Sequence, residues 1–538
     1  MNRRHFLQSA LYGSLIYGVG GTPGIIKPAL AGFEPVQNNL LVNLFLSGGP
    51  DIRHFIVPEF DSNQNSFGYK YWSNRWRAHD LTEDSSTWQQ RWSDDYYKIT
   101  VGGSNWNGSL VDIAGINNGV TFGIWKHAGW LIDMFRAGNV AIVSNAVGGR
   151  NRAHDLSSLQ MHQGNLLSGL NDSDRSGWGG RLARSAGGNS IAITNSPLPF
   201  TFGPVGSAPN YDVNGIDNRD LVAVQNSREM GLNEADLTQD QLYRPNERMA
   251  RALKQYYTGL RNEQISLAYE KFRDHEQKVR QFGELIRDRL SDLPLPLLID
   301  ALRNGVEIGG QAVNPDSSGD ARRVLRSGYS FGAQIRNLYD VLAANDLLNV
   351  RTVSMYYGGW DSHGDQRQNA GNLDINDPNV NRGIESGFKD IFGGQFGASP
   401  SDSNALHSGF SALWESLNSV DRQKMVITVA GEFGRQIRDN GDAGTDHGKG
   451  NTMFIIGEGV TGGVYGEMFQ DDEVDKYDDS SLRTPDIEPR TDLDSMFASV
   501  CDWVQPNSGD TVFPRTASGF SGEQPEEEVS GMFQNLMS

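Results

Sequence analysis

The chain has 538 residues, of which 37% are hydrophobic, 10% aromatic and 21% charged. This composition excludes the non-globular classes and leaves room for several domains. The formal net charge of -19 at pH 7 argues against nucleic acid as a partner, because phosphate binding needs clustered lysine and arginine side chains.

The first 31 residues have the features of an export signal. The pair Arg3-Arg4 precedes a short, mildly apolar and glycine-rich segment at residues 11–21, and small residues at 29–31 offer a cleavage site. We expect a twin-arginine signal peptide over residues 1–31 and a periplasmic or secreted mature protein. The alternative is an ordinary N-terminal helix or membrane anchor, but the apolar stretch is too short to span a bilayer. We therefore expect no stable membrane span after signal removal.

Leu40–Leu46 is the first strong strand pattern, and it runs into the sequence S-G-G-P-D at residues 47–51. Asp51 thus follows the carboxyl end of a strand, the edge at which open α/β sheets bind ligands. It is a candidate metal ligand. The alternative interpretation is a turn former or helix cap.

Two segments interrupt the alternation of strands and helices. Residues 59–110 are rich in tryptophan, and the pairs Trp72/Trp76 and Trp88/Trp92 have helical i,i+4 spacing. These pairs indicate either the core of an insertion or a sugar-stacking platform. Residues 218–330 show the apolar stripes of amphipathic helices and predict a helical insertion or cap.

Residues 140–164 predict a strand, a glycine-rich loop and a helix. Arg150, Arg152 and His154 lie in the loop just before the helical pattern, so the helix N-terminus and the arginines predict an anion pocket. His154 is a candidate ligand or proton donor. The alternative is that these side chains only cap the helix and form salt bridges in a surface loop.

Acidic and histidine residues recur after or before three further predicted strands, at 350–357, 426–429 and 453–456. The side chains at these strand ends are those of Asp361, His363, Glu432, Asp446 and His447. Carboxylate oxygens and imidazole nitrogens suit a divalent metal. The alternatives are purely structural roles: a hydrogen-bonded pair for Asp361 and His363, an ion pair of Glu432 with Arg435, and an Asx turn at Asp446.

Predicted helices at 124–136, 156–164, 329–347, 405–417 and Leu493–Val504 alternate with these strands. We therefore expect an α/β fold with a mostly parallel central sheet flanked by helices. Its two parts are residues 32–217 and 331–520, separated by the helical insertion, and residues 521–538 form a frayed tail.

The ordered motifs resemble the bacterial family called domain of unknown function family 1501. They are the twin-arginine start, G-G-x-D ending at Asp51, G-W-D-x-H at 359–363, E-F-G-R at 432–435, G-T-D-H-G-x-G-N at 444–451 and G-G-x-x-G at 462–466. The resemblance spans residues 40–504. That family is similar to the alkaline phosphatase and sulfatase superfamily, which implies an alkaline phosphatase-like sheet with divalent metals at the strand ends.

Carried over residue by residue, the resemblance implies the metal ligands Asp51, Asp361, His363, Glu432 and His447, with Asp446 as a further ligand or a partner of one. Two departures stand out. The loop at residues 151–154 reads N-R-A-H where relatives commonly read S-R-S-H, so it has no hydroxyl nucleophile. Glu432-Phe433 also replaces the usual Asp-His, which removes one imidazole.

These residues predict an exported metal-dependent hydrolase of phosphate or sulfate esters, acting on a small anionic ester. The divalent metal is zinc, calcium, magnesium or manganese. Water would attack with metal assistance, Arg152 or Arg435 would neutralise developing charge, and His154 would protonate the leaving group. The alternative is a non-catalytic, metal-stabilised binding or assembly protein with a degraded site. The sequence does not indicate an oligomeric state.

Overall fold

The computed structural model describes residues 38–102, 116–170, 176–194, 197–203, 331–368, 383–394, 407–479, 485–491, 493–513 and 532–538, together with a few shorter pieces between them. The expected signal peptide and nearly all of the expected helical insertion lie outside the described residues. Within the described residues, no helix has the length and apolar character needed to cross a membrane.

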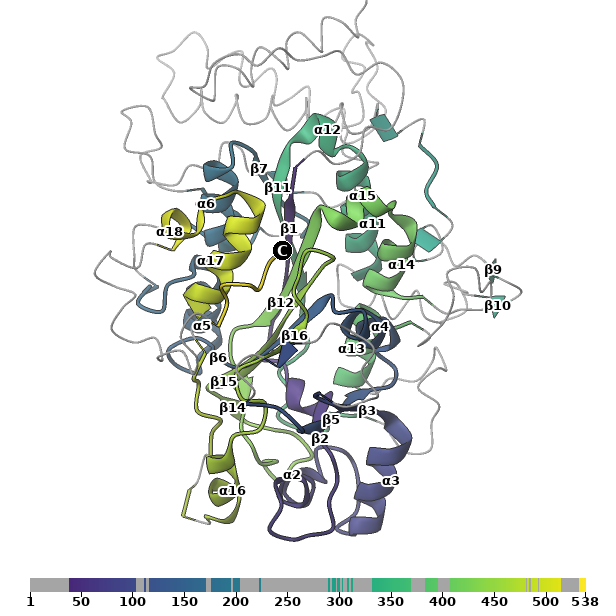
Figure 1. Ribbon diagram of the computed structural model, residues 1–538, viewed down its shortest axis with the longest axis vertical. Helices are drawn as coiled ribbons and strands as arrows, with labels where there is room; N and C mark the ends of the chain where they lie inside the picture. The colour runs from purple at the N-terminus through teal and green to yellow at the C-terminus, as the bar shows by residue number, and fades with distance from the viewer. Residues whose placement is uncertain are drawn as a thin grey trace, which may run out of the picture.

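A nine-stranded sheet forms the centre of the described structure (Figure 1). Its strand order is β4-β16-β6-β15-β12-β1-β11-β7-β8. The strands are β1 (Leu40–Leu46), β4 (Val111–Asp112), β6 (Val140–Val147), β7 (Asn189–Ala192), β8 (Val222–Ala223), β11 (Val350–Tyr357), β12 (Met425–Gly431), β15 (Gly450–Ile456) and β16 (Gly463–Tyr465). Within this sheet the described strand pairs are parallel, except that β15 is antiparallel to both β12 and β6. The mostly parallel α/β sheet predicted from the sequence is confirmed.

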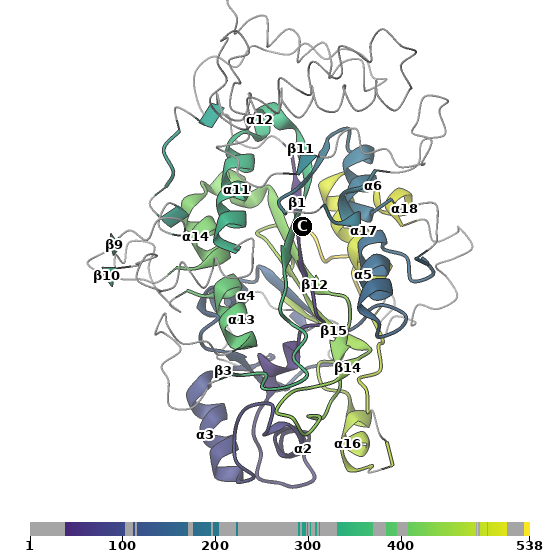
Figure 2. The same cartoon turned by 180° about the vertical axis from the view of Figure 1, so that it is seen from behind.

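Helices cover both faces of this sheet, as the two opposite views show (Figures 1 and 2). One face packs against α4 (Gly129–Arg136), α11 (Phe331–Ala343), α13 (Ile384–Phe392) and α14 (Gly409–Ser416). The other packs against α5 (His154–Gln163), α6 (Trp178–Ser185), α17 (Leu493–Val504) and α18 (Gly509–Val512). The short helices α12 (Asn345–Leu348) and α15 (Ser419–Gln423) precede β11 and β12.

The two apolar cores explain why the central strands, such as β1, are largely apolar along their length. Val42 and Leu44 of β1 belong to the first core, whereas Leu41 and Phe45 belong to the second. Successive side chains of a strand point to opposite faces, so a strand covered on both sides must be apolar at nearly every position.

A smaller antiparallel sheet lies beyond one end of the large one (Figure 1). It consists of β2 (Ile56–Pro58), β5 (Thr121–Trp125) and β3 (Tyr96–Thr100), and it is accompanied by α2 (Phe67–Arg75), α3 (Ser85–Asp95) and α16 (Asp471–Asp478). The predicted helix at 124–136 was wrong at its start, because residues 121–125 pair as β5 and the helix begins only at Gly129.

Three tryptophans of this smaller part, Trp72, Trp88 and Trp92, are core residues, whereas Trp76 is partly buried and packs against that core. Trp72 is fully buried, and Trp88 and Trp92 are buried beside it in the first apolar core. Their burial favours the interpretation as a packed core over a sugar-stacking platform, because a stacking platform needs exposed ring faces.

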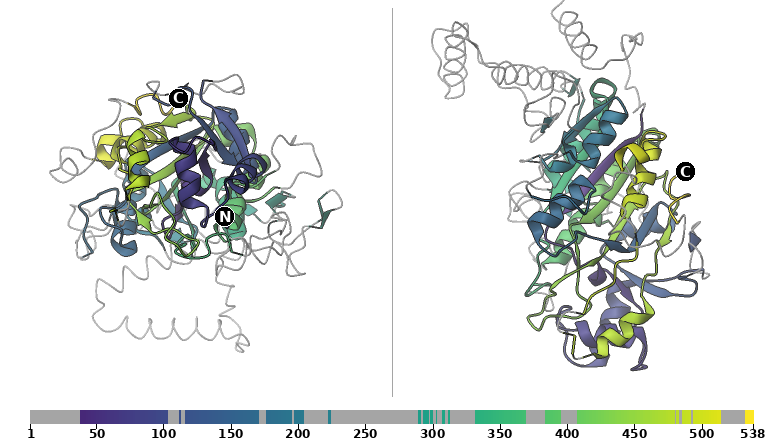
Figure 3. Two further views of the ribbon diagram at one scale, coloured as in Figure 1. Left: turned by 90° about the horizontal axis from the view of Figure 1, so that it is seen from below. Right: turned by 90° about the vertical axis from the view of Figure 1, so that its left-hand side faces the viewer.

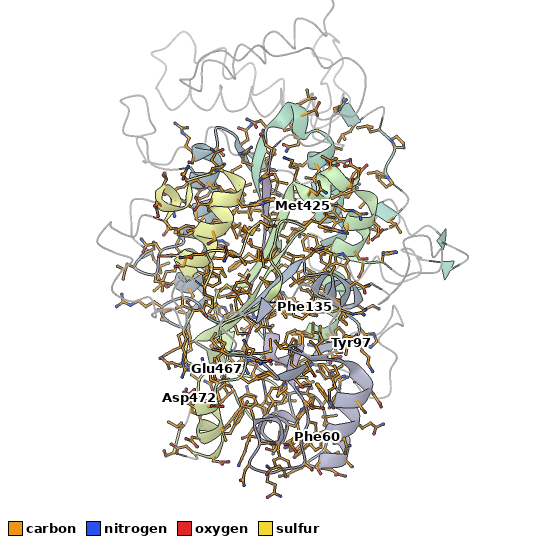
Figure 4. The ribbon with its side chains drawn as sticks, viewed as in Figure 1. Phe60, Tyr97, Phe135, Met425, Glu467 and Asp472 are labelled. Atoms are coloured by element: carbon orange, nitrogen blue, oxygen red, sulfur yellow. The ribbon has the colours of Figure 1, made fainter. Side chains whose placement is uncertain are left out.

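The parallel strands run toward the smaller sheet. Met425, the first residue of β12, lies in the upper half of the molecule in Figure 4. β14 (His447–Gly448) lies in the lower half, at the end of the large sheet that is nearer α2 and α16 (Figure 1). The side view shows the same arrangement, with the part that carries the smaller sheet below the large one (Figure 3, right). The carboxyl edge of the sheet is therefore partly covered.

The last seven residues depart from the expected frayed tail. Met532, Phe533 and Leu536 are buried in the second apolar core, and Ser538 donates its backbone N–H to Gly459 at 2.8 Å. Residues 521–531 lie outside the described part of the chain.

Candidate metal centre

The reversed direction of one strand brings the predicted ligands together. Asp361 follows β11 and Glu432 follows β12, so both lie at the carboxyl edge of the parallel strands. Because β15 is antiparallel to its neighbours, the residues just before it reach the same edge. His447, three residues before β15, is placed there by this reversal.

A small hairpin holds His447 in place. β13 (Gly434–Arg435) pairs with β14, with Arg435 opposite His447. The preceding Thr445 donates its backbone N–H to the carbonyl of Ser362 at 3.1 Å. The loop before β15 is thus bonded to the loop after β11.

Three side-chain atoms form a compact triangle at this edge. Nε2 of His363 lies 2.9 Å from Nε2 of His447, and the two nitrogens lie 3.1 and 3.0 Å from Oδ1 of Asp361. Ligands about 2.0–2.1 Å from a tetrahedral zinc ion lie roughly 3.3 Å apart, close to these separations. The side chains of Asp361 and His363 are 46% exposed, so the triangle is open to solvent.

Hydrogen bonds on the far side of each ring determine which nitrogen faces the triangle. His447 Nδ1 lies 2.9 Å from the carbonyl oxygen of Arg152, and His363 Nδ1 lies 2.9 Å from Oδ1 of Asp446. A carbonyl and a carboxylate only accept hydrogen bonds, so each Nδ1 carries the proton. In the neutral rings both Nε2 atoms therefore present lone pairs to Asp361, an arrangement that a cation between them stabilises.

His154 completes the cluster from the first turn of α5. Its Nδ1 lies 2.8 Å from Oε1 of Glu432, and its Nε2 lies 3.4 Å from Oδ2 of Asp361. His154, Asp361 and His447 place possible ligand atoms within 4.8 Å of one another. Glu432 is fully buried and accepts a hydrogen bond from the Gly48 N–H at 2.8 Å, and its Oε2 has no partner among the residues that the structure describes.

The local charges favour an ionised Asp361 and a neutral His447. Partial burial raises the pKa of Asp361, but the adjacent His447 ring and the Arg435 guanidinium outweigh this effect and bring the pKa to about 2. Burial lowers the pKa of His447. Asp446 also has a lowered pKa, because bonds from Asn440 and His363 outweigh its partial desolvation.

The two predicted arginines have different surroundings. Arg435 is buried, and its guanidinium donates to the carbonyls of Gly48, Gly49, Trp360 and Thr445 as well as to Oδ1 of Asp361. These bonds fix the loops and leave Arg435 unable to turn toward a substrate. Arg152 bonds to the His447 carbonyl at 3.0 Å and to Asp486 at 3.4 Å, and its side chain is 35% exposed.

Asp51 lies apart from this cluster. Its Oδ2 accepts from Arg75 at 2.6 Å and from Gln366 at 2.9 Å, and the residue is 1% exposed. Burial raises the pKa of Asp51, but the charge of Arg75 and the hydrogen bonds from Arg75 and Gln366 outweigh it and hold the pKa below its ordinary value. Among the described residues, no hydrogen bond or ion pair joins Asp51 to the predicted ligands, and its ion-pair partner is the guanidinium of Arg75.

The sequence reasoning missed Arg75 and Gln366. Arg75 lies on α2, within the tryptophan-rich segment, and its position three residues after Trp72 was the available signal that it shares a helix face with a core residue. Gln366 lies in the loop after β11. No sequence pattern around it indicates a functional role, because most of its hydrogen-bond partners come from distant parts of the chain.

The described fold and site define a mixed α/β protein with a histidine and carboxylate cluster at the carboxyl edge of its central sheet. Residues 341–487 match the model of a family described as "Protein of unknown function (DUF1501)". This segment carries Asp361, His363, Glu432 and His447, whereas Asp51 and His154 lie before it. No curated protein and no solved structure matches the chain.

Proposed function

We propose that this protein is an exported metal-dependent hydrolase of phosphate or sulfate esters, built on an alkaline phosphatase-like fold. The observation that carries the proposal is the shared orientation of three imidazole rings. His154, His363 and His447 each have Nδ1 bonded to an oxygen acceptor and Nε2 directed at Asp361. Metal-binding histidines in proteins are oriented by such bonds to carboxylates or carbonyls.

The donor set fits one divalent metal. In the proposal, Asp361, His363 and His447 hold the ion, and the exposed side of the triangle remains for water or substrate. Imidazole and carboxylate ligands together favour zinc or a similar transition ion over calcium or magnesium. Glu432 and Asp446 orient His154 and His363 instead of binding the ion, and Asp51 is not a ligand because Arg75 pairs with it.

A bound divalent ion would polarise the ester and lower the pKa of a coordinated water toward neutrality. The chain's own residues supply the other parts of the reaction. His154 is held by Glu432 through Nδ1, so in the imidazolium form its second proton is on Nε2, and that proton is transferred to the leaving-group oxygen. Arg152, half-exposed beside His447, neutralises charge on the phosphoryl or sulfuryl group. Arg435 fixes the position of Asp361.

The attacking group in this proposal is water. The residue before α5, where the resemblance implies a nucleophile nearby, is Ala153, and its side chain offers no hydrogen bond to the helix. Ser157 is buried and donates its hydroxyl to the carbonyl of Asn151. These two observations argue against a protein nucleophile in this loop.

The test combines elemental analysis with turnover. Mature protein purified without chelator is compared with the Asp361→Ala/His447→Ala variant, and both are assayed on aryl phosphate and aryl sulfate esters. We expect about one divalent ion per chain and turnover in the wild type, and neither in the variant. His407→Ala is the matched control, because His407 is half-buried and bonds to Ser411 on α14.

Two results would contradict the proposal in different ways. Metal without ester turnover would favour the alternative of a non-catalytic, metal-stabilised binding or assembly protein. Absence of metal from the wild type, with unchanged melting after chelation, would remove the ligand assignment itself.

A further inference from the structure

Gln366 is bonded to four separate groups beneath the candidate metal centre. Its Nε2 lies 2.9 Å from Oδ2 of Asp51 and 3.0 Å from Nδ1 of His54. Its Oε1 lies 3.1 Å from the hydroxyl of Ser362 and 3.2 Å from that of Thr445. The residue is 1% exposed, so water does not compete for these bonds.

The orientation of this amide follows from its partners. The Asp51 carboxylate only accepts, so the NH₂ group of Gln366 must face it and the carbonyl must face the two hydroxyls. The second N–H then donates to Nδ1 of His54, which leaves the His54 proton on Nε2 to bond to Glu385 at 2.9 Å. All four hydrogen-bonding positions of the amide are therefore occupied, and a flipped amide would place two acceptors together.

The two hydroxyl partners are immediate neighbours of the proposed ligands. Ser362 lies between Asp361 and His363, and Thr445 lies two residues before His447. Both hydroxyl residues are buried, and the same two loops are joined by the backbone bond from Thr445 to Ser362. The Gln366 carbonyl thus binds both ligand loops at once.

The other end of Gln366 is anchored to a rigid part of the molecule. Asp51 follows β1, the central strand between β11 and β12, and is paired with the buried Arg75. The backbone N–H of Gln366 donates to Ala443 at 2.8 Å, and its carbonyl accepts from Ile384 at 3.1 Å. Both the backbone and the side chain of Gln366 are therefore held in one position.

We infer that Gln366 is a positioning residue that fixes loops 361–363 and 445–447 relative to each other, so that Asp361, His363 and His447 converge on one metal ion. This inference rests on the proposed metal site. It extends that proposal to a residue that contacts neither the metal nor the substrate and that lies three to five residues beyond the ligands of its own loop.

The test measures metal affinity, the spectrum of the cobalt-loaded protein and backbone hydrogen exchange in Gln366→Met. Methionine keeps the approximate volume and removes all four bonds. Loss of a bond that orients a metal ligand typically weakens metal binding about 10–100-fold. We expect at least about tenfold weaker Co²⁺ and Zn²⁺ binding and a changed cobalt absorption spectrum. Thr445→Val, which removes one hydroxyl, is the milder variant if Gln366→Met does not fold.

Gln334→Met is the matched control. Gln334 is 2% exposed, and within the described part of the chain its amide bonds to the backbone of Tyr356 on β11, at 2.7 and 2.9 Å. A general loss of buried amide bonds would affect both variants, whereas the positioning role predicts a changed spectrum and affinity only for Gln366→Met. The double variant Gln366→Met/Thr445→Val should be no weaker than Gln366→Met by more than about twofold, because the two changes remove the same link.

The outcomes separate this inference from the proposed function. If the wild type binds metal and Gln366→Met binds it within twofold with the same spectrum, the inference is wrong and the metal site stands. If the wild type binds no metal, the proposed function fails. Backbone hydrogen exchange then tests whether Gln366 holds the two loops in position. Faster exchange at 361–363 and 445–447 in Gln366→Met alone then supports it, and unchanged exchange overturns it.

Discussion

Nε2 of His447 lies 3.0 Å from Oδ1 of Asp361, although the two residues are 86 positions apart in the chain. Asp361 follows the carboxyl end of β11, which is parallel to its neighbour β1, and His447 precedes the start of β15, which is antiparallel to β12. Because β15 runs against its neighbours, the beginning of one strand and the end of another share one edge of the sheet. This reversal is what creates the cluster.

Replacement of His154 should separate metal binding from proton transfer. His154→Ala leaves the Asp361, His363 and His447 triangle intact, so we expect metal content within about twofold of the wild type. Loss of a general acid typically lowers the rate about 10²–10⁴-fold, which we expect for ester turnover. Elemental analysis and steady-state kinetics measure the two effects. Asp155→Ala, at the adjacent exposed position, is the control, and loss of metal from His154→Ala would instead make His154 a ligand.

Gly48 should be sensitive to any side chain. It has φ +121°, and a Cβ there would lie 2.3 Å from the backbone nitrogen of Asp361. Gly187 also has a positive φ, +64°, but a Cβ there would meet nothing within 4 Å. Both alanine substitutions carry a cost of about 1 kcal/mol or more for backbone conformation, and only Gly48→Ala displaces Asp361.

We therefore expect Gly48→Ala to lower the free energy of unfolding by about 2 kcal/mol more than Gly187→Ala and to weaken metal binding as well. Urea unfolding of the chelated proteins and metal titration give the two values. Equal effects of the two substitutions would show that the loops after β1 and β11 are not in close contact.

Phe388 should be a major contributor to the core on the α13 face. Its ring is fully buried and stacks on Phe55 with centroids 3.9 Å apart, so it connects the large sheet to the smaller one. Replacement of a buried phenylalanine by alanine typically lowers the free energy of unfolding by about 3–5 kcal/mol, and we expect that range for Phe388→Ala. Val420→Ala, at a position 40% exposed, should change it by less than about 0.5 kcal/mol. Urea unfolding followed by tryptophan fluorescence measures both.

His162 should make stability depend on pH. Burial beside Phe45 lowers the pKa of His162 to about 3, so the folded protein holds the ring neutral while the unfolded chain protonates it near 6.5. The folded pKa is the lower one, so stability is fully present above about pH 6.5 and is lost as pH falls toward 3. At pH 4.5 this contribution is smaller by about 2–3 kcal/mol than at pH 7.5.

The substitution His162→Leu should remove the part of the decrease in unfolding free energy between pH 7.5 and 4.5 that comes from protonation of this ring. Unfolding free energies of the chelated wild type and variant at pH 7.5 and 4.5 give the comparison, and Met161→Leu controls for repacking of α5. An identical pH dependence in all three proteins would mean that His162 is not buried as a neutral ring.

The main strands could be predicted from the sequence because of a simple physical constraint. β1, β6, β12 and β15 are covered by helices on both faces, so each is a largely apolar run, and such runs are visible without any structure. The grouping of Asp361 and Glu432 at one edge was also predictable, because both follow parallel strands and parallel strands share the edge at which they end. The arrival of His447 at that edge depends on the reversed direction of β15, which the sequence did not indicate. The segment at 121–125 was not, because its strand pairing with β2 and β3 outweighs its local pattern.

The roles of individual side chains required the tertiary structure. Asp51 follows its strand much as Asp361 does, yet the guanidinium of Arg75 on α2 forms an ion pair with it. Gln366 has four partners from three parts of the chain, which are Asp51 and His54 after β1, Ser362 in its own loop and Thr445 before β15. The sequence by itself determined which segments are the main strands and that Asp361 and Glu432 follow the ends of two of them, since both follow from local pattern and chain direction. Only the tertiary structure decided which of those side chains face one another, since hydrogen bonds and ion pairs depend on atoms brought together from distant parts of the chain.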